Sequence, residues 1–295
     1  RAAAEAGSTD AMVLYGNLLV TGQLASLRPQ RVSTPSTGRG PGGVVDVEPV
    51  AWGSDRERKQ WEREAVGWYE KAADGGQPDA WYNIALLHFE GRVLPKDDDK
   101  AEMCLHFAAK LGDADALYVI GSQKFNDDGA ESKAMGEAYL EQASDFGHAE
   151  AAYYMAMVHR ERGNMADMRQ RLEHAAAHGY AEAHFCLGDM CYHGSDGFTV
   201  NLPRAMRHFA AAGRLRHPGA LTSLGAMFYS GMGTQRDVRK AFEAYQLAAE
   251  CGSTQAMRNL ASMHMEGEGC DKDAKKARYL IKVADKGDKE QEEAQ

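Results

Sequence analysis

The side chains best suited to bind a metal ion lie between residues 174 and 193. His174 and His178 are four residues apart on a predicted helix, a spacing at which two imidazoles can face one metal ion. A second set follows: His184, Cys186, Cys191 and His193. The histidine pair has no specified third ligand, and on a helix the side chains of Cys186 and Cys191 point well apart. We therefore expect histidines near a helix C-terminus and thiols that pack in the core, with no metal site.

The spacing of residues in the sequence predicts neither a catalytic site nor a nucleotide-binding loop. Gly231-x-Gly233 and Gly38-x-Gly40 follow no predicted strand, and neither carries the Lys-Ser/Thr pair of a phosphate-binding loop. No nucleophile, base and orienting acid stand at spacings that would assemble a triad. The sequence therefore predicts a protein that is not an enzyme and that uses neither a cofactor nor a small-molecule substrate.

The composition is that of a folded acidic protein. The 295 residues are 44% hydrophobic, which is enough to bury a core, and carry a formal net charge of −9. This balance argues against broad non-specific binding to nucleic acid, which needs clustered Lys and Arg. Because no apolar run approaches the ~20 residues that span a bilayer, we expect no membrane insertion.

Cysteine usage and the first residue bear on the compartment. The five cysteines are an odd number without paired spacing, which indicates free thiols in a reducing compartment, the mitochondrial matrix or the cytoplasm. Residue 1 is Arg and not Met, which favours an imported and processed protein.

A repeated pattern organises the chain. The pair Lys240-Ala241 recurs 36 residues later as Lys276-Ala277, and Arg204-Ala205 stands 36 residues before it. Each pair opens a segment of helical period that closes on small residues and a Gly, as in Ala248-Ala249-x-x-Gly252. A fixed period of this length indicates a repeat array, and we count about seven units.

Each unit predicts two antiparallel helices. In the first, Ala220, Leu224 and Phe228 are spaced i, i+4 and form one apolar stripe. A small residue at its centre would let the second helix approach closely: Gly16, Ala85, Gly121, Gly188, Gly225 and Ala261. A glycine-rich loop ends the first helix, and Asn201, Asp237 or Asp273 could cap the second. Such a hairpin cannot cover its own apolar face, so the units must stack.

The combined pattern resembles the Sel1-like repeat family, a relative of the tetratricopeptide repeat. Residues 224–252 carry it most fully: Leu-Gly-x-Met-Phe-Tyr-x-Gly-x-Gly, then Asp237, Lys240-Ala241, Tyr245, Ala248-Ala249 and Gly252. The resemblance implies an all-α, right-handed superhelix of about seven antiparallel helix pairs of ~36 residues, over residues 1–287, with a polar tail at 288–295. It also implies an adaptor or scaffold that binds proteins and has no catalytic activity.

Two stretches depart from the pattern. Residues 112–179 keep the helices but lose the glycine-rich loop, with Asn126-Asp127-Asp128-Gly129 in its place. Residues 25–57 form a Pro- and Gly-rich insertion without periodicity. It is either a tolerated loop, our default, or a binding arm whose contacts would be Arg28, Arg31, Arg39 and Trp52.

One position of the first helix predicts a binding surface. An aromatic residue recurs there in four successive units: Tyr82, Tyr118, Tyr153 and Phe185. By analogy with related superhelices this position would line a concave face and form an aromatic ladder with further large residues of the first helices: Leu86, Phe89, Met157, Tyr192 and Tyr229. The alternative is a packing position shared by the repeats. The function favoured is a scaffold, a structural subunit or assembly factor of a larger complex, that binds proteins on this face and through the insertion. The alternative is an RNA-associated solenoid of a ribonucleoprotein that contacts RNA through local Arg residues.

Overall fold

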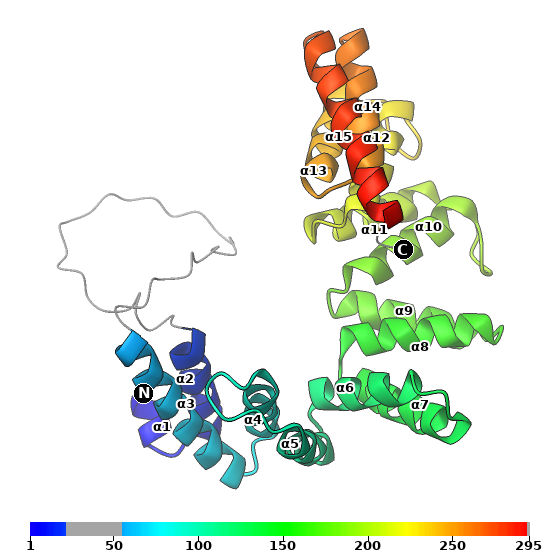
Figure 1. Ribbon diagram of the computed structural model, residues 1–295. Coiled ribbons are helices and arrows are strands. Elements are labelled where there is room, and N and C mark those ends of the chain that lie inside the picture. Colours follow the sequence, from blue (N-terminus) through cyan, green and yellow to red (C-terminus); the bar gives the residue numbers. More distant parts are fainter. Residues whose placement is uncertain (22–54, 294–295) are drawn as a thin grey trace. The chain divides into compact units, whose positions relative to one another are not determined.

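The computed structural model describes residues 1–21 and 55–293, and every regular element in these residues is an α-helix (Figure 1). The helices, in order, are α1 (Ala2–Glu5), α2 (Thr9–Thr21), α3 (Asp55–Asp74), α4 (Pro78–Glu90), α5 (Asp98–Lys110), α6 (Ala114–Phe125), α7 (Ala130–Asp145), α8 (Ala149–Glu161), α9 (Met165–Ala177), α10 (Ala181–His193), α11 (Leu202–Arg214), α12 (Pro218–Ser230), α13 (Val238–Glu250), α14 (Thr254–Glu266) and α15 (Ala274–Glu293). None of these described helices is long and apolar enough to cross a membrane. The expected insertion contacts lie outside the described residues: Arg28, Arg31, Arg39 and Trp52.

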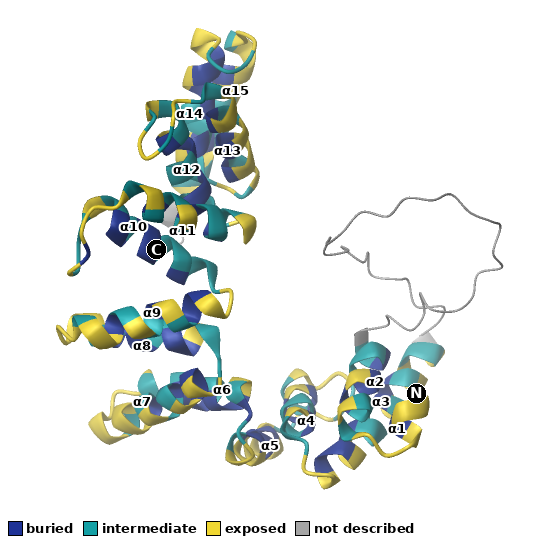
Figure 2. Ribbon diagram, turned by 180° about the vertical axis from the view of Figure 1, so that it is seen from behind, coloured by how far each residue is buried: buried dark blue, intermediate teal, exposed yellow. Residues whose placement is uncertain are grey.

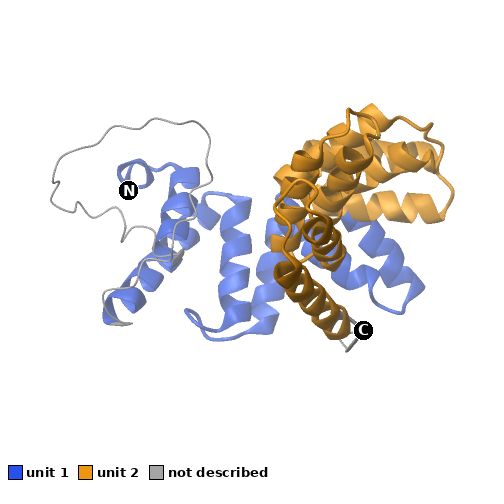
Figure 3. Ribbon diagram, turned by 90° about the horizontal axis from the view of Figure 1, so that it is seen from above, with its two compact units in different colours: residues 1–142 blue, residues 143–295 orange. Residues whose placement is uncertain are grey.

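The chain divides into two compact units, residues 1–142 and residues 143–295 (Figure 3). In the first unit α2 packs on α3, α4 on α5 and α6 on α7. In the second unit α8 packs on α9, α10 on α11, α12 on α13 and α14 on α15. Within the described residues these seven helix pairs confirm the prediction of an all-α array of about seven two-helix repeats.

The predicted helix caps are present. The backbone N–H of Lys240 donates to Asp237 at 3.1 Å, that of Arg204 to Asn201 at 3.0 Å, and that of Lys276 to Asp273 at 3.0 Å. Each bond satisfies one of the free N–H groups at the start of a second helix. First helices end on a left-handed glycine where the loop is glycine-rich: Gly91, Gly194, Gly231 and Gly267. The glycines and the capping residues of these loops therefore set where each helix ends and the next begins.

The small central residues do bring the paired helices together. A Cβ atom built on Gly225 would lie 2.6 Å from the ring of Tyr245, and one built on Gly188 would lie 2.7 Å from the ring of Phe209. The pair with Ala85 on its first helix carries the smaller Leu105 where these pairs carry an aromatic ring. Buried segments alternate with exposed ones along the helices (Figure 2). The recurring alanines near the start of the first helices are fully buried: Ala80, Ala116, Ala151, Ala183, Ala220 and Ala256. Close helix approach is thus encoded by matched residue sizes.

The degenerate stretch at residues 112–179 keeps its helix pairs. Without the glycine-rich loop, the C-cap residues of α6 and α8 are Asn126 and Arg162, both with right-handed backbone.

The loop after α10 is longer and folds back on α9, where the guanidinium of Arg169 lies 4.2 Å from the ring centroid of Phe198. Arg169 also donates to the carbonyl of Gly197 at 3.1 Å. Cation–π and hydrogen-bond contacts therefore hold this loop against the preceding pair.

One repeat uses an arginine where the others use a glycine. The turn after each second helix needs a positive φ, which a glycine supplies at six such turns: Gly7, Gly76, Gly112, Gly147, Gly179 and Gly252. The turn between α11 and α12 instead places Arg216 at φ 60. A residue with a side chain is strained in this left-handed backbone region. Because Arg216 stands where the other turns have glycine, the series of glycines in the sequence misses this unit.

Candidate functional site

The predicted ladder residues contact the following repeat in the second unit. The ring of Phe185 on α10 stacks on the imidazole of His217, with centroids 4.6 Å apart. The ring of Tyr153 on α8 lies 5.2 Å from the ring of Tyr180. Tyr180 and His217 are the N-cap residues of α10 and α12, the next first helices along the chain. This ladder position therefore touches the start of the following repeat.

The same position serves the same purpose where it is not aromatic. Thr222 on α12 places its hydroxyl 2.9 Å from that of Ser253, the N-cap residue of α14. Arg258 on α14 donates to Asp285 at 3.0 Å and also to Asp288. The contacts of Tyr153, Phe185 and Thr222 favour the packing alternative for this position, because each of them joins one repeat to the next. The contacts of Arg258 join the two helices of its own pair, α14 and α15.

In the first unit, the carboxylates that act on the pKa of Tyr82 indicate a related arrangement. Burial, with the carboxylates of Asp115 and Asp113 beside it, raises the pKa of Tyr82. Asp113 is the N-cap residue of α6, so Tyr82 again faces the start of the following helix pair. Leu86 is the most open of the ladder residues on α4, whereas Phe89 on α4 and Tyr118 on α6 are half-buried.

Two further ladder residues, Tyr192 on α10 and Tyr229 on α12, contact residues of the loops. The hydroxyl of Tyr192 donates to the sulfur of Met232 at 3.2 Å, and that of Tyr229 donates to Glu268 at 2.6 Å. The latter bond raises the pKa of Tyr229 and lowers that of Glu268, which Arg236 also contacts at 3.3 Å. Burial raises the pKa of Tyr153. Within the second unit, the ladder side chains are thus partly occupied by contacts inside the protein.

The candidate metal ligands are not brought together into a site. His174 and His178 stack with ring centroids 4.4 Å apart, and burial followed by the neighbouring His178 lowers the pKa of His174. Cys191 is buried as predicted, whereas Cys186 is half-buried with its sulfur 3.9 Å from the hydroxyl of Tyr153. The described residues contain no group of three or more His, Cys, Asp or Glu side chains placed to hold a metal ion.

An exposed apolar stripe on α5 is the feature that the sequence interpretation missed. Met103, Phe107 and Leu111 follow one another at intervals of four residues and remain 51%, 44% and 47% exposed. Phe107 is partly supported by the ring of Trp81, with centroids 5.1 Å apart. The spacing was visible in the sequence, but it lies on a second helix, whereas the predicted ladder lies on first helices. Three large exposed apolar residues in one row are typical of a docking surface.

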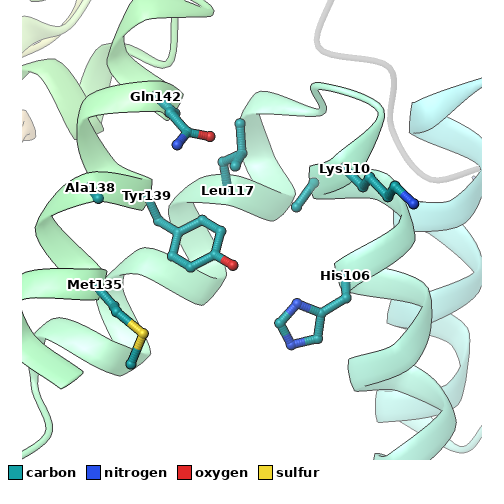
Figure 4. Close-up of a pocket in the computed structure, with 8 residues that line it drawn as sticks. His106, Lys110, Leu117, Met135, Ala138, Tyr139 and Gln142 are labelled. Atoms are coloured by element: carbon teal, nitrogen blue, oxygen red, sulfur yellow. The ribbon is translucent and has the colours of Figure 1, made fainter. Parts of the chain in front are cut away.

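A cavity of about 470 Å³ lies beside this stripe, between α5 and α7 in the first unit (Figure 4). His106 and Lys110 project from α5, and Met135 and Tyr139 come from α7, with Leu117 of α6 at the base. Met135 is itself exposed. The lining mixes apolar side chains with the polar groups of His106, Tyr139 and Gln142, and Lys110 supplies a cation at one edge. Such a lining suits an apolar side chain next to a carboxylate.

Among the described residues, a second depression, of about 540 Å³, is lined by side chains of α3. Arg56, Lys59, Gln60 and Arg63 line it, and they repeat at intervals of three and four residues. Its three cations are exposed, in an otherwise acidic protein. Arg56 and Arg63 belong to the local arginines through which the RNA alternative would contact RNA.

The repeats match a known family along much of the chain. The Sel1 repeat model matches residues 56–77, 78–113, 181–217, 218–253 and 254–284, which together are more than half of the chain. It passes over residues 114–180, where the structure nevertheless has α6 to α9. The helix pairs there persist because the apolar stripe is kept although the loop residues are not.

Curated relatives share part of their length with this chain. The DAP3-binding cell death enhancer 1 of Mus musculus is 30% identical over 169 residues, which are 56% of this chain and 33% of that protein. An uncharacterized protein of Neisseria meningitidis serogroup B is 26% identical over 171 residues, 58% of this chain and 36% of that protein. The chain thus spans about a third of the length of the curated relatives it matches.

Solved structures agree on the fold. A protective antigen of uropathogenic Escherichia coli strains that displays an SLR fold has a TM-score of 0.65 at 22% identity, over 75% of this chain and 48% of that one. A Sel1 repeat protein from Oxalobacter formigenes has a TM-score of 0.62 at 21% identity, over 76% of this chain and 92% of that one. Together with the repeat matches and the helix pairs, these likenesses show that the chain belongs to the Sel1 repeat family.

Proposed function

We propose that this chain is a non-catalytic scaffold that holds an amphipathic helix of a partner protein along the α5 stripe of its first unit. Sel1 repeat proteins are in general protein-interaction scaffolds. The observation that carries the proposal is the row of exposed Met103, Phe107 and Leu111 beside the cavity between α5 and α7. An apolar row of this spacing matches a helix that presents its own residues at i, i+4 and i+7.

The energetic case rests on surface that folding leaves uncovered. Fully burying a Leu, Met or Phe side chain contributes about 1.5–3 kcal/mol, so covering three half-exposed ones adds about 2–4 kcal/mol. Lys110 and His106 border the row and would face the polar edge of the partner helix. Because the scaffold is already folded, little of this gain is spent on ordering it.

The finer parts of the function are proposals on separate grounds. Binding of a partner by the ladder requires exposed side chains, and Leu86 is the most exposed of them on α4. We propose that Leu86 and Tyr82 contact the partner in the first unit. The name of the mouse relative records binding to another protein, which supports a protein ligand and membership of a larger assembly. Free thiols at all five cysteines support a reducing compartment, the mitochondrial matrix or the cytoplasm.

The test uses two residues at the same place in the repeat. Phe107 on α5 and Leu247 on α13 are both 44% exposed, but only Phe107 stands in an apolar row. Phe107→Glu should weaken partner binding by about 2 kcal/mol, or about thirtyfold in Kd. Leu247→Glu should leave it unchanged. Binding is measured by affinity purification and titration of the partner that copurifies with the wild-type chain. Equal losses in both variants, or none in either, would reject the stripe as the docking surface.

RNA association is the second candidate, and the exposed cations of α3 favour it. Arg56, Lys59 and Arg63 could each neutralise one phosphate. Replacing all three by Ala should then reduce the slope of log K against log salt by about 2 for a single strand, while Arg239→Ala on α13 should not change it. Filter binding of a single-stranded RNA at about 50 mM salt measures this slope; absence of binding there rules the candidate out.

A further inference from the structure

Methionine side chains are open to solvent at few places on the molecule. All 14 methionines of the chain lie in the residues that the structure describes. Those of the repeat core are buried: Met155, Met168, Met190, Met227 and Met263. Four residues are between 42% and 51% exposed: Met103, Met135, Met232 and Met265. These four are the methionines that a reagent in solution reaches most easily.

The two exposed methionines of the first unit both belong to the surface proposed to hold a partner. Met103 is the first residue of the α5 stripe. Met135 of α7 lines the cavity beside the stripe (Figure 4). The remaining methionine of this unit, Met12 on α2, is half-buried and packs against the core. In the first unit, exposed thioethers therefore occur at the docking surface and nowhere else among the described residues.

A thioether at such a surface can accept one oxygen atom from a hydroperoxide. A lone pair of the sulfur attacks the outer peroxide oxygen, the O–O bond breaks and the sulfoxide forms. The peroxide leaves as an alcohol, or as water when it is hydrogen peroxide. The sulfur loses the two electrons that the peroxide gains, so no further reactant is needed. A flexible apolar side chain becomes a polar one, and methionine sulfoxide reductases reverse the change.

We propose that Met103 and Met135 are oxidation sites at which a hydroperoxide releases the helical partner from the α5 stripe. This inference rests on the proposed function, because it concerns the regulation of the same surface. A bound helix covers both side chains, and a sulfoxide oxygen covered by an apolar helix face loses its water without gaining a hydrogen bond. Oxidation therefore weakens the complex at the stripe and at the cavity together.

The thiol on the same helix is a poor competitor for the oxidant. Cys104 of α5 is 4% exposed, and burial raises its pKa. Because the thiolate is the form that reacts, a buried thiol with a raised pKa is oxidised slowly. The two products also differ in what reverses them. Dithiothreitol alone reduces a sulfenic acid or a disulfide, whereas a methionine sulfoxide needs the reductases.

The experiment titrates the full chain with a fluorescent synthetic amphipathic helix that carries leucines at i, i+4 and i+7, before and after treatment with hydrogen peroxide. We expect oxidation to weaken binding by about tenfold. Methionine sulfoxide reductases A and B should restore it, and dithiothreitol alone should not. Peptide mass spectrometry measures the oxidation of each methionine, and circular dichroism checks that the helices persist.

Two double variants locate the effect. Met103→Leu with Met135→Leu conserves volume and removes the sulfur, so it should bind like the wild type and keep its affinity after oxidation. Met232→Leu with Met265→Leu is the matched control, because it removes the two exposed thioethers of the second unit. This control should lose affinity on oxidation as the wild type does.

Several results would overturn the proposal. Binding that persists after Met103 and Met135 are oxidised would do so, as would an equal loss in the variant that lacks both sulfurs. Resistance of these two residues to peroxide, while Met232 and Met265 are converted, would also reject it. Failure of the proposed function looks different, because Phe107→Glu would then bind the helix like the wild type before any oxidation, and the docking surface and this inference would fall together. A loss in Phe107→Glu with no response to peroxide would reject the inference alone.

Discussion

Replacing Gly225 by alanine adds one methyl group at the point where α12 meets α13. The new Cβ would lie 2.6 Å from Cε1 of Tyr245, 2.7 Å from its Cδ1 and 3.1 Å from its Cγ. The ring has little room to move, because Tyr245 is 4% exposed. The two helices must therefore move apart, or the ring must leave its rotamer.

Two opposing effects set the magnitude. Overpacking a close-packed core costs about 1–3 kcal/mol, and contacts this short place Gly225→Ala near the upper end. Alanine in place of glycine stabilises a helix by about 1 kcal/mol. The net expectation is a loss of about 1–2 kcal/mol. Gly67 on α3 is the control, because a Cβ there meets no atom within 4 Å; Gly67→Ala should stabilise the chain by about 0.5–1 kcal/mol.

Urea unfolding followed by circular dichroism at 222 nm measures both variants. A double-mutant cycle with Tyr245→Leu identifies the cause, since Ala85 and Leu105 already form this combination in another pair. The double variant should be more stable than the sum of the single changes by about 1 kcal/mol or more. If Gly225→Ala instead stabilises the chain as Gly67→Ala does, the close-approach argument is wrong.

Three further predictions use the same assay. Arg216→Gly removes the side chain from the left-handed turn and should raise the free energy of unfolding by about 1 kcal/mol, whereas no gain would mean that the turn is unstrained. Asp237→Ala removes the cap on the N–H of Lys240 and should lower it by about 1 kcal/mol; a change below 0.3 kcal/mol would contradict the cap. Burial, with His184 beside it at 3.3 Å, lowers the pKa of His208 from 6.5 to about 4. The folded state thus favours the neutral ring, so stability present above pH 6.5 is lost as the pH falls toward about 4, and His208→Gln should flatten the profile in that window.

The internal physics of one repeat could be predicted from sequence because it depends on local residue types. Gly225 opposite Tyr245 and the cap at Asp237 both follow from spacing within about thirty residues. The arginine turn was missed because Arg216 adopts a conformation that the pattern assigns to glycine.

The candidate surfaces were harder to predict, because periodicity tells which residues share a helix face but not which face is covered. The stripe at Met103, Phe107 and Leu111 has the spacing of a core row and is nevertheless exposed. In the same way α15 continues through residues 288–293, which the sequence assigned to a polar tail, and Gly287 is not one of the positive-φ glycines. With no described helix packed beyond it, Arg258 fastens the extended helix through Asp285 and Asp288.

The ladder position shows why repeats that share one fold do not share one sequence. Along the second unit the residue two places after the buried alanine changes from a ring to a hydroxyl, and its partner at the start of the next first helix changes with it. The junctions pair Tyr153 with Tyr180, Phe185 with His217, and Thr222 with Ser253. Ring meets ring and hydroxyl meets hydroxyl, so each junction is matched to its own neighbour. This matching sets the order of the units while leaving the second helices free to differ, and it is on the second helices, α5 and α15, that the exposed apolar side chains accumulate.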